Sequence, residues 1–368
     1  MKYNLEKHFI PDSKAQQLNY AMGLGVNIGN SLDSTMGGRH GITGLDLETA
    51  WGNPKITRQF VTALRKAGFK TVRLPVSWHD HVSGEDDKIE EDWLARVREI
   101  TEWCLEEGMF VQLNTHHDIF KGFLVPDDEG FPRAKEYLVN VWRQLSEEFK
   151  DVSGEKLLFE SMNEIRMRET SYEWSPDYNN PDCVRAMENI NKLNEAFVNT
   201  VRSTGGENAG RYLIIPGYST STEGVCWDGF RLPDDPAEGK LLVSAHVYSP
   251  AHFTFRLQEG TDQITFDPDD EASTGPLHER LGKLYEKFVT NGIPVTVNEF
   301  GATAKDNDPE RVKYLGYMVA KAGSFGIQCC YWDNGRKDGP GEGMGIIDRN
   351  TGVFFHKEML DAMLVNLV

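Results

Sequence analysis

The chain has 368 residues, of which 39% are hydrophobic and 11% aromatic. This composition is typical of a folded protein, and the length suits one large α/β barrel or two ordinary domains. The formal net charge of −18 makes a nucleic acid or an anionic membrane surface an unsuitable partner, because their phosphate groups would be repelled.

Apolar, β-prone runs recur about eight times along the chain, and helical patterns separate most of them. The strand-like runs fall at residues 22–28, 70–76, 109–115, 157–163, 211–216, 241–247, 294–299 and 327–332. The helical patterns fall at residues 56–68, 91–108, 133–150, 184–205, 277–292, 308–323 and 356–368. Gly68, Gly108 and Gly292 close three of these helices, as C-cap glycines commonly do. The interval 217–240 lacks a clear helix.

These β-then-α units, spaced roughly forty residues apart, predict the α/β class and a single (β/α)8 TIM barrel with a parallel sheet. No linker rich in Pro, Gly or Ser divides the chain. We therefore expect one catalytic domain over residues 1–368, with residues 1–20 as an N-terminal extension. The segments 165–183 and 248–275 are long loops, and such loops in a compact domain are usually functional.

The first residues, MKYNLEKHFIPDSK, have no apolar core of the kind that a signal peptide needs, and no stretch is long enough to span a membrane. We expect a cytoplasmic protein, or a secreted one if an export signal has been removed. The five cysteines show no metal-ligand spacing, and their odd number argues against a complete disulfide framework. Buried free thiols are the expected state.

Two of the apolar runs end in an Asn-Glu pair, FESMNE (159–164) and VTVNEF (295–300). In a (β/α)8 barrel, catalytic residues gather at the C-terminal ends of the strands. The polar or aromatic side chains near predicted strand ends are Asn27, Asn30, Arg73, Asn114, His116, His117, Asn163, Glu164, His246, Tyr248, Glu299, Trp332 and Asp333. A strand interior does not hold an unpaired charge cheaply, so Glu164 and Glu299 are interpreted as a matched acid and nucleophile.

Each candidate also has a structural interpretation. Glu164 alone could be a salt-bridge partner, and Arg73, which lies in an apolar run, would need a buried carboxylate. The run 116–118 (His-His-Asp) could hold a metal ion, but adjacent side chains on a strand point to opposite faces and no HExxH motif is present. We therefore predict no metal site. GYSTS (217–221) begins like a nucleophile elbow but lacks its closing glycine, so a serine hydrolase is not expected.

With these residues the chain resembles glycoside hydrolase family 5, in the cellulase-type branch of the retaining (β/α)8 glycosidases. The resemblance runs from GVNIGNSLD (25–33) to YWDNG (331–335), and ETAWGNP (48–54) is most similar to the endoglucanase and xyloglucanase subfamily 4. The family's polar active-site positions match Arg73, His116, Asn163, Glu164, His246, Tyr248, Glu299 and Trp332. Two positions depart from the family, since Ile165 replaces the usual Pro and Asn298 replaces the common Gly.

The resemblance implies that Glu164 is the general acid/base and Glu299 the nucleophile, with Glu164 protonated near neutral pH and Glu299 ionised. It further implies that Arg73 and Tyr248 hydrogen-bond Glu299, and that His246 lies beside Glu164. The side chains implied to contact sugar are Asn163, His116, His117, Trp332, Asp333, Trp51 and Asn27. No cofactor is required by this scheme.

The activity implied by the resemblance is that of a retaining endo-β-1,4-glucanase from a bacterium, acting as a monomer. Its substrate would be a polysaccharide or oligosaccharide, either a cellulose-like β-glucan or xyloglucan. A β-mannanase or a lichenase would share the same catalytic residues, because the loops around the site select the sugar. A carbohydrate-binding protein without catalysis would lack a carboxylate, yet both are present, and a metal-dependent barrel hydrolase would lose activity on chelation.

Overall fold

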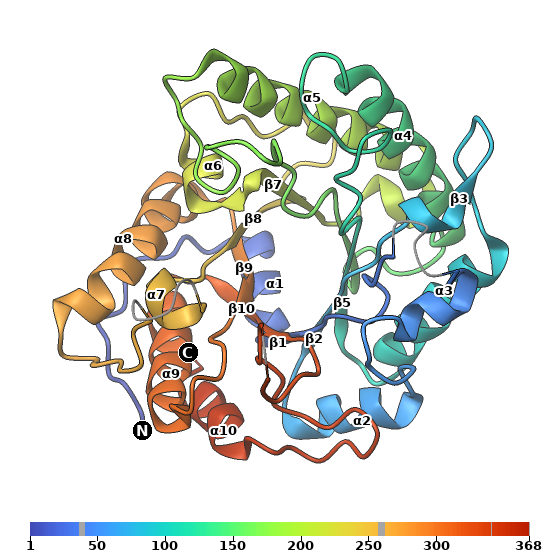
Figure 1. Cartoon of the computed structure of the whole chain (residues 1–368). Coiled ribbons are helices and arrows are strands. Elements are labelled where there is room, and N and C mark those ends of the chain that lie inside the picture. Colours follow the sequence, from blue (N-terminus) through green and yellow to red (C-terminus); the bar gives the residue numbers. More distant parts are fainter. Residues whose placement is uncertain (37–40, 257–261, 340, 368) are drawn as a thin grey trace.

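The structure is a computed structural model that describes residues 1–36, 41–256, 262–339 and 341–367. Its centre is a closed barrel of eight parallel strands, which pair in chain order until the last returns to the first. The strands are β1 (Leu24–Ile28), β2 (Thr71–Leu74), β5 (Phe110–Asn114), β6 (Leu157–Glu160), β7 (Leu213–Ser221), β8 (Leu241–His246), β9 (Val295–Phe300) and β10 (Gln328–Asp333). Figure 1 shows helices surrounding this barrel, which confirms the predicted (β/α)8 TIM barrel.

The outer layer consists of helices that follow the strands. The long helices are α2 (Arg58–Ala67), α3 (Glu91–Glu106), α4 (Phe131–Glu148), α5 (Pro181–Ser203), α8 (Glu271–Lys287), α9 (Asp308–Ser324) and α10 (Lys357–Val365). Shorter elements are α6 (Thr222–Cys226), α7 (Ala251–Thr254), the hairpin of β3 (Val82–Ser83) with β4 (Lys88–Ile89), and four 3₁₀ segments, Gly44–Thr49, His79–His81, Gly206–Ala209 and Val289–Asn291. The unit with no predicted helix contains only the five-residue α6.

Both ends of α2 are set by capping residues. At the start of α2, the Thr57 hydroxyl accepts a hydrogen bond from the backbone N–H of Phe60. Gly68 ends this helix in the left-handed conformation, with φ of 109°, as the sequence predicts. No described helix combines the length and apolar character that crossing a membrane requires.

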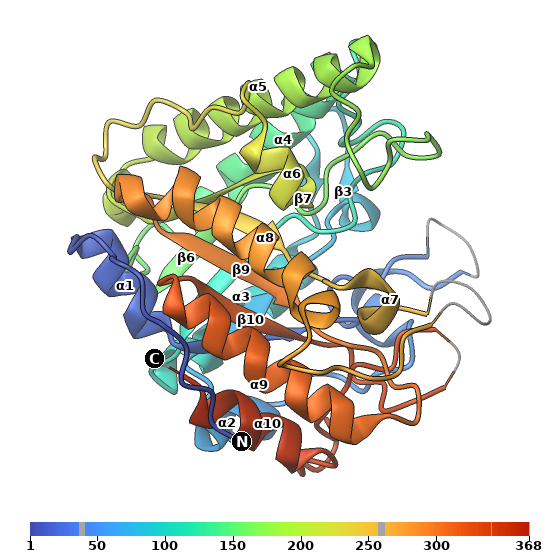
Figure 2. The same cartoon turned by 90° about the vertical axis from the view of Figure 1, so that its left-hand side faces the viewer.

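The N-terminal extension contains a helix that the sequence analysis did not predict. The helix α1 (Lys14–Met22) lies across the N-terminal end of the barrel (Figures 1 and 2). Its Asn19 amide donates to the backbone carbonyls of Val295 and Gly326. Two of its four buried residues, Gln16 and Asn19, are polar, so the apolar period that marks the other helices is missing here.

The two ends of the chain meet on the outside of the barrel. The backbone N–H of Tyr3 donates to Oδ1 of Asn366 at 2.7 Å, and Nδ2 of Asn366 donates to the carbonyl of Met1 at 2.9 Å. Figure 2 shows both marked ends away from α7 and from the loops at the opposite end of the barrel. These loops, which follow the C-terminal ends of the strands, carry the site described next.

Candidate active site

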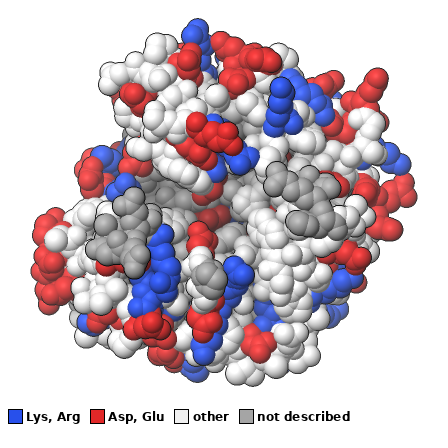
Figure 3. All heavy atoms as spheres, viewed as in Figure 1, with Lys and Arg blue, Asp and Glu red and all other residues white. Residues whose placement is uncertain are grey.

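A cleft of about 820 Å³ opens at the C-terminal ends of the barrel strands. Figure 3 shows this face hollowed at its centre, with acidic side chains inside the hollow. The predicted site residues that line the cleft are Trp51, His116, His117, Asn163, Glu164, His246, Tyr248, Glu299 and Trp332. Three others, Asn27, Arg73 and Asp333, are buried and lie outside the lining.

The two glutamates face each other across His246. Nδ1 of His246 lies 2.9 Å from Oε1 of Glu164 and 3.4 Å from Oε2 of Glu299. One carboxylate oxygen of each glutamate and a ring nitrogen of the histidine all lie within 4.8 Å of one another. The Tyr248 hydroxyl donates to Oε2 of Glu299 at 3.0 Å, and burial raises the pKa of Tyr248 well above its usual value, so this donor keeps its proton.

The two glutamates reach the cleft from different kinds of backbone. Glu299 lies inside β9, whereas Glu164 lies four residues beyond the end of β6, whose ladder with β7 stops at Glu160. The strand predicted over 157–163 therefore ends at Glu160, and Glu164 reaches the cleft from the loop that follows the strand. Glu164 has a φ of 44°, in the left-handed region that few residues other than glycine adopt.

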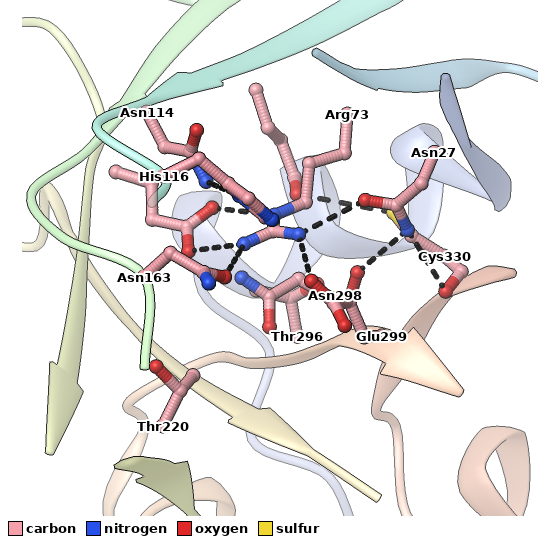
Figure 4. Close-up of polar contacts among 12 residues, drawn as sticks. Asn27, Arg73, Asn114, His116, Asn163, Thr220, Thr296, Asn298, Glu299 and Cys330 are labelled. Atoms are coloured by element: carbon pink, nitrogen blue, oxygen red, sulfur yellow. Dashed lines mark hydrogen bonds and ion pairs between the residues drawn. The ribbon is translucent and has the colours of Figure 1, made fainter. Parts of the chain in front are cut away.

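A buried arginine forms the floor beneath the pair. Arg73 is fully buried on β2, and its Nη1 lies 2.5 Å from Oε1 of Glu299 (Figure 4). Its Nε and Nη2 bind both oxygens of Glu160 at 2.7 and 2.8 Å. Burial alone would lower the pKa of Arg73, but Glu160 and Glu299 outweigh this and raise it, so the guanidinium stays charged.

Glu160 is a site residue that the sequence analysis missed. Arg73 was expected to have a buried carboxylate partner, and Glu299 was the one assigned to it. The available signal was the string LLFE (157–160), in which an apolar, fully buried strand ends in a glutamate. A buried acid at a strand end needs a cation beside it. Arg73 is on β2, which is separated from β6 by β5 alone.

Arg73 also orients two asparagines, with different consequences. Its Nη2 donates to Oδ1 of Asn163 at 2.8 Å, which leaves the amide NH2 of Asn163 as the end that can donate to a ligand. Its Nη1 donates to Oδ1 of Asn27 at 3.0 Å, and Nδ2 of Asn27 donates to the carbonyl of Asn298 at 2.9 Å. Asn27 lies outside the cleft lining and both ends of its amide are bound within the protein, so the structure places it beneath the site, where it holds Arg73, and not at the predicted position against the sugar.

Asp333 likewise has a structural position. It is 1% exposed, pairs with Nη2 of Arg349 at 3.1 Å, and accepts the backbone N–H groups of Gly335 and Ile346. All of these partners lie in the segment that follows β10. The prediction that Asp333 binds substrate is therefore wrong, because its carboxylate is used to fold this segment.

Aromatic rings and imidazoles form one wall of the cleft. The rings of His116 and Trp332 are parallel to within 4°, with centroids 5.8 Å apart, and His117 lies 5.4 Å from Trp51. Burial lowers the pKa of His116 well below its usual value, so its ring is neutral. A Cβ at position 29 would lie 2.7 Å from the Trp332 ring, so the indole can occupy this position because residue 29 is glycine.

The cleft also contains residues that the sequence analysis did not select. Trp174, on the loop 165–183, is 58% exposed, and the Arg166 guanidinium lies 3.6 Å from its ring centroid. Nη1 of the same arginine donates to the carbonyl of Glu164 at 2.8 Å. Glu342 faces the cleft near Glu164 and Glu299, and burial of its carboxyl and their negative charges raise its pKa to about 7.

The two departures from the family pattern are both buried. Ile165 is fully buried in the main core cluster. Asn298 is also fully buried, and neither Nδ2 nor Oδ1 of its side chain has a hydrogen-bond partner among the described residues.

Comparison with known proteins identifies the family. The profile described as Cellulase (glycosyl hydrolase family 5) matches residues 35–338. The chain belongs to glycoside hydrolase family 5. This family 5 enzyme is 34% identical to Endoglucanase A of Ruminococcus albus over 360 residues, which cover 97% of the chain and 94% of that protein.

Two solved structures resemble this glycoside hydrolase to different degrees. A family 5 lichenase from Caldicellulosiruptor sp. F32 superposes with a TM-score of 0.97 at 37% identity, covering 99% of this chain and 98% of that one. A xyloglucan-specific endo-β-1,4-glucanase from a metagenomic library superposes with a TM-score of 0.86 at 31% identity, covering 96% and 98%.

Burial and charge move the two glutamates of this glycoside hydrolase in opposite directions. Burial raises the pKa of Glu299, against the opposing effects of His246 and Arg73, and the negative Glu164 adds to the rise. Burial also raises the pKa of Glu164, but the hydrogen bond and charge of His246, with the charge of Arg166, outweigh it and lower the pKa overall. The lowered pKa of Glu164 is opposite to the rise that its predicted role as a protonated acid requires, and the cause is its hydrogen bond with His246 at 2.9 Å.

Among the described residues, two groups of side chains have the composition of a metal site. They are Asp33 with His116 and His117, and Glu164 with His246 and Glu299. The His116 and His117 rings lie 4.4 Å apart, edge to face, because they follow β5 instead of lying within it. The argument that adjacent histidines point to opposite faces is therefore wrong here. That the enzyme needs no metal remains a prediction.

Proposed function

We propose that this family 5 enzyme is a retaining endo-β-1,4-glucanase that cuts unbranched and mixed-linkage β-glucans within the chain. The observation that carries the mechanism is the distance of at most 4.8 Å between carboxylate oxygens of Glu164 and Glu299. Retaining glycosidases hold their carboxyl groups about 5–5.5 Å apart, whereas inverting enzymes need about 6.5–9.5 Å to admit a water between them. The short distance supports direct attack by a carboxylate.

In the first step, Glu299 attacks the anomeric carbon and Glu164 gives its proton to the departing glycosidic oxygen. A covalent bond forms between the sugar and Glu299, and the glycosidic bond breaks. In the second step, Glu164 takes a proton from water, whose oxygen attacks the same carbon and releases Glu299. Two inversions give net retention. Arg73 and Tyr248, at 2.5 and 3.0 Å from Glu299, stabilise it as an anion and as the leaving group.

The hydrogen bond between Glu164 and His246 connects the general acid to a second polar side chain, with Nδ1 of His246 at 2.9 Å from Oε1 of Glu164. A sugar chain that fills the cleft expels water, which disfavours the ionised form of Glu164 relative to the neutral acid. Glu164 then carries the proton that the departing glycosidic oxygen takes.

The cleft wall suits a chain of glucose rings. We assign Trp332 as the stacking surface for the sugar being cleaved, and Asn163, through its free amide NH2, as a donor to the 2-hydroxyl of that sugar. His116 and His117 would hydrogen-bond its other hydroxyls, and Trp51 would stack on the next sugar toward the non-reducing end. We further propose that the enzyme acts as a monomer without a cofactor, and full activity after dialysis against EDTA would support the latter.

The catalytic assignment is tested by replacing the nucleophile. Glu299→Ala should abolish turnover of polymeric glucan, since no bond to the sugar can form. On an activated aryl β-cellobioside, azide should restore activity and yield the glycosyl azide of inverted configuration. Glu155→Ala is the matched control, because Glu155 is exposed and its ion pair with Lys240 is long, at 3.8 Å. Wild-type turnover by Glu299→Ala, or an inverted first product from the native enzyme by NMR, would refute the mechanism.

The substrate assignment rests on the closer match to the lichenase than to the xyloglucan-specific enzyme. The lichenase of that species has also been solved with cellotetraose. Release of reducing sugar should therefore be faster from mixed-linkage glucan and carboxymethyl cellulose than from xyloglucan or glucomannan. A higher rate on xyloglucan would show that the cleft accepts branches and would contradict this assignment, and a higher rate on glucomannan would favour the β-mannanase alternative.

A further inference from the structure

The segment GYSTS (217–221), which is not a nucleophile elbow, has an unusual backbone beside Glu164. The ladder between β7 and β8 shifts register between Pro216 and Ser221. Within this bulge, Ser219 and Thr220 both have a φ of 47°. The left-handed region is unfavourable for residues other than glycine, and a β-branched residue such as threonine is rare there. Two such residues in succession indicate a conformation that the surroundings impose.

Close contacts in the same segment hold this conformation. A Cβ at Gly224 would lie 2.3 Å from the carbonyl oxygen of Tyr218, and one at Gly217 would lie 2.7 Å from the carbonyl carbon of Gly224. Only glycine therefore allows the bulge to fold against the start of α6. Ser219 and Thr220 are 4% and 0% exposed, so both residues are packed against the surrounding protein.

The strained segment makes two hydrogen bonds with the backbone around Glu164. Oγ1 of Thr220 accepts the N–H of Glu164 at 2.8 Å, and the N–H of Ser219 donates to the carbonyl of Ile165 at 2.8 Å. Figure 4 shows the Thr220 hydroxyl pointing toward the chain segment that carries Asn163. Arg166 binds the carbonyl of Glu164 at 2.8 Å. Glu164, itself at a φ of 44°, is thus held at both of its backbone polar groups.

We propose that Thr220 is a positioning residue for the general acid, and that the bulge of β7 exists to present its hydroxyl to the backbone of Glu164. Glu164 lies beyond the end of β6, and the backbone bonds to the neighbouring strands end one residue before it, where the N–H of Asn163 donates to the carbonyl of Thr115 at 2.9 Å. The Thr220 hydroxyl replaces the missing ladder bond and aims the carboxyl at the glycosidic oxygen. This inference rests on the proposed role of Glu164.

The test compares Thr220→Val, which keeps the shape but removes the acceptor oxygen, with Thr220→Ser, which keeps the oxygen. The substrates are mixed-linkage glucan, whose leaving group needs a proton, and 2,4-dinitrophenyl β-cellobioside, whose leaving group does not. Misplaced catalytic groups cost up to about 100-fold. We expect kcat/KM of Thr220→Val to fall about 10- to 100-fold on the glucan and less than about threefold on the aryl substrate. Thr220→Ser should restore the glucan rate.

Two further variants guard against a merely structural effect. Thr222→Val is the matched control, because Thr222 is equally buried nearby and its hydroxyl has no partner among the described residues; both rates should be unchanged. Thr220→Gly should fold even if Thr220→Val does not, since glycine favours a positive φ, and it should show the same loss on the glucan alone. Equal losses on both substrates, or none on the glucan, would overturn the inference.

Glu164→Gln, measured in parallel, separates this inference from the proposed function. It should lose far more activity on the glucan than on the aryl substrate. If it does so while the Thr220 variants do not, the positioning role is wrong and the acid assignment stands. If Glu164→Gln shows no dependence on the leaving group, the proposed function fails and the role of Thr220 fails with it.

Discussion

The Arg73–Glu160 pair offers the strongest test of how the floor of the site is built. Glu160→Gln removes one negative charge from a fully buried cluster and leaves one oxygen to accept from Arg73. Removing one member of a buried ion pair costs about 3–5 kcal/mol, and the retained acceptor places this change near 3 kcal/mol. Unfolding entropies of about 2.1 cal/mol/K per residue give about 0.8 kcal/mol/K for 368 residues. The melting temperature should fall by about 4 °C.

The same change should alter the pH profile in a direction that the geometry sets. Without Glu160, the charge of Arg73 acts on Glu299 alone, so the pKa of Glu299 falls. Because the nucleophile must be ionised, the acidic limb of kcat/KM should move to lower pH. Calorimetry and a pH series on mixed-linkage glucan measure both effects, with the exposed Glu155→Gln as control. An unchanged melting temperature, or an acidic limb that moves to higher pH, would refute this account of the floor.

Three further predictions concern the cleft. Tyr248→Phe removes a donor to Glu299, so the pKa of Glu299 should rise and the acidic limb of kcat/KM should move to higher pH, opposite to the previous variant. Trp332→Ala should lower kcat/KM on glucan roughly 5- to 150-fold, because about 1–3 kcal/mol of apolar contact with the sugar is lost. The melting temperature should change little, because the ring faces the cleft. Glu342→Gln removes a negative charge near Glu164, so the alkaline limb should move to lower pH; a limb that stays in place would show that the two carboxyls do not interact.

The barrel could be predicted because its signals are local. Each parallel strand is a short apolar run, and the long helices that follow the strands have an amphipathic period, so the alternation can be read without knowing any contact. The helix α1 could not be found in this way. Its buried face includes Gln16 and Asn19, whose amides bind backbone carbonyls at the bottom of the barrel, and only the closed barrel supplies those carbonyls.

The site was predictable to the extent that strand ends determine it. Residues at the ends of β5, β8 and β9 entered the cleft as expected, because parallel strands present their C-terminal ends to one face. Asn27 and Asp333 also lie at or near strand ends, yet their side chains are used to hold Arg73 and the segment after β10. The position of a residue in the sequence indicates which end of the barrel it occupies. It does not indicate whether the polar atoms of its side chain are already bonded to other protein groups. The lowered pKa of Glu164 depends on its contact with His246 at 2.9 Å, and the spacing of these residues in the sequence does not reveal that contact.

The meeting of the chain ends has a practical consequence for anything attached to this enzyme. The bonds of Asn366 with Tyr3 and Met1 keep both ends on the outside of the barrel, away from the cleft loops. A solid support or a fused module joined at either end would therefore leave the glucan's path clear. A short peptide could also bridge the two ends directly, which makes the fold a suitable starting point for circular permutation with new ends in an exposed loop.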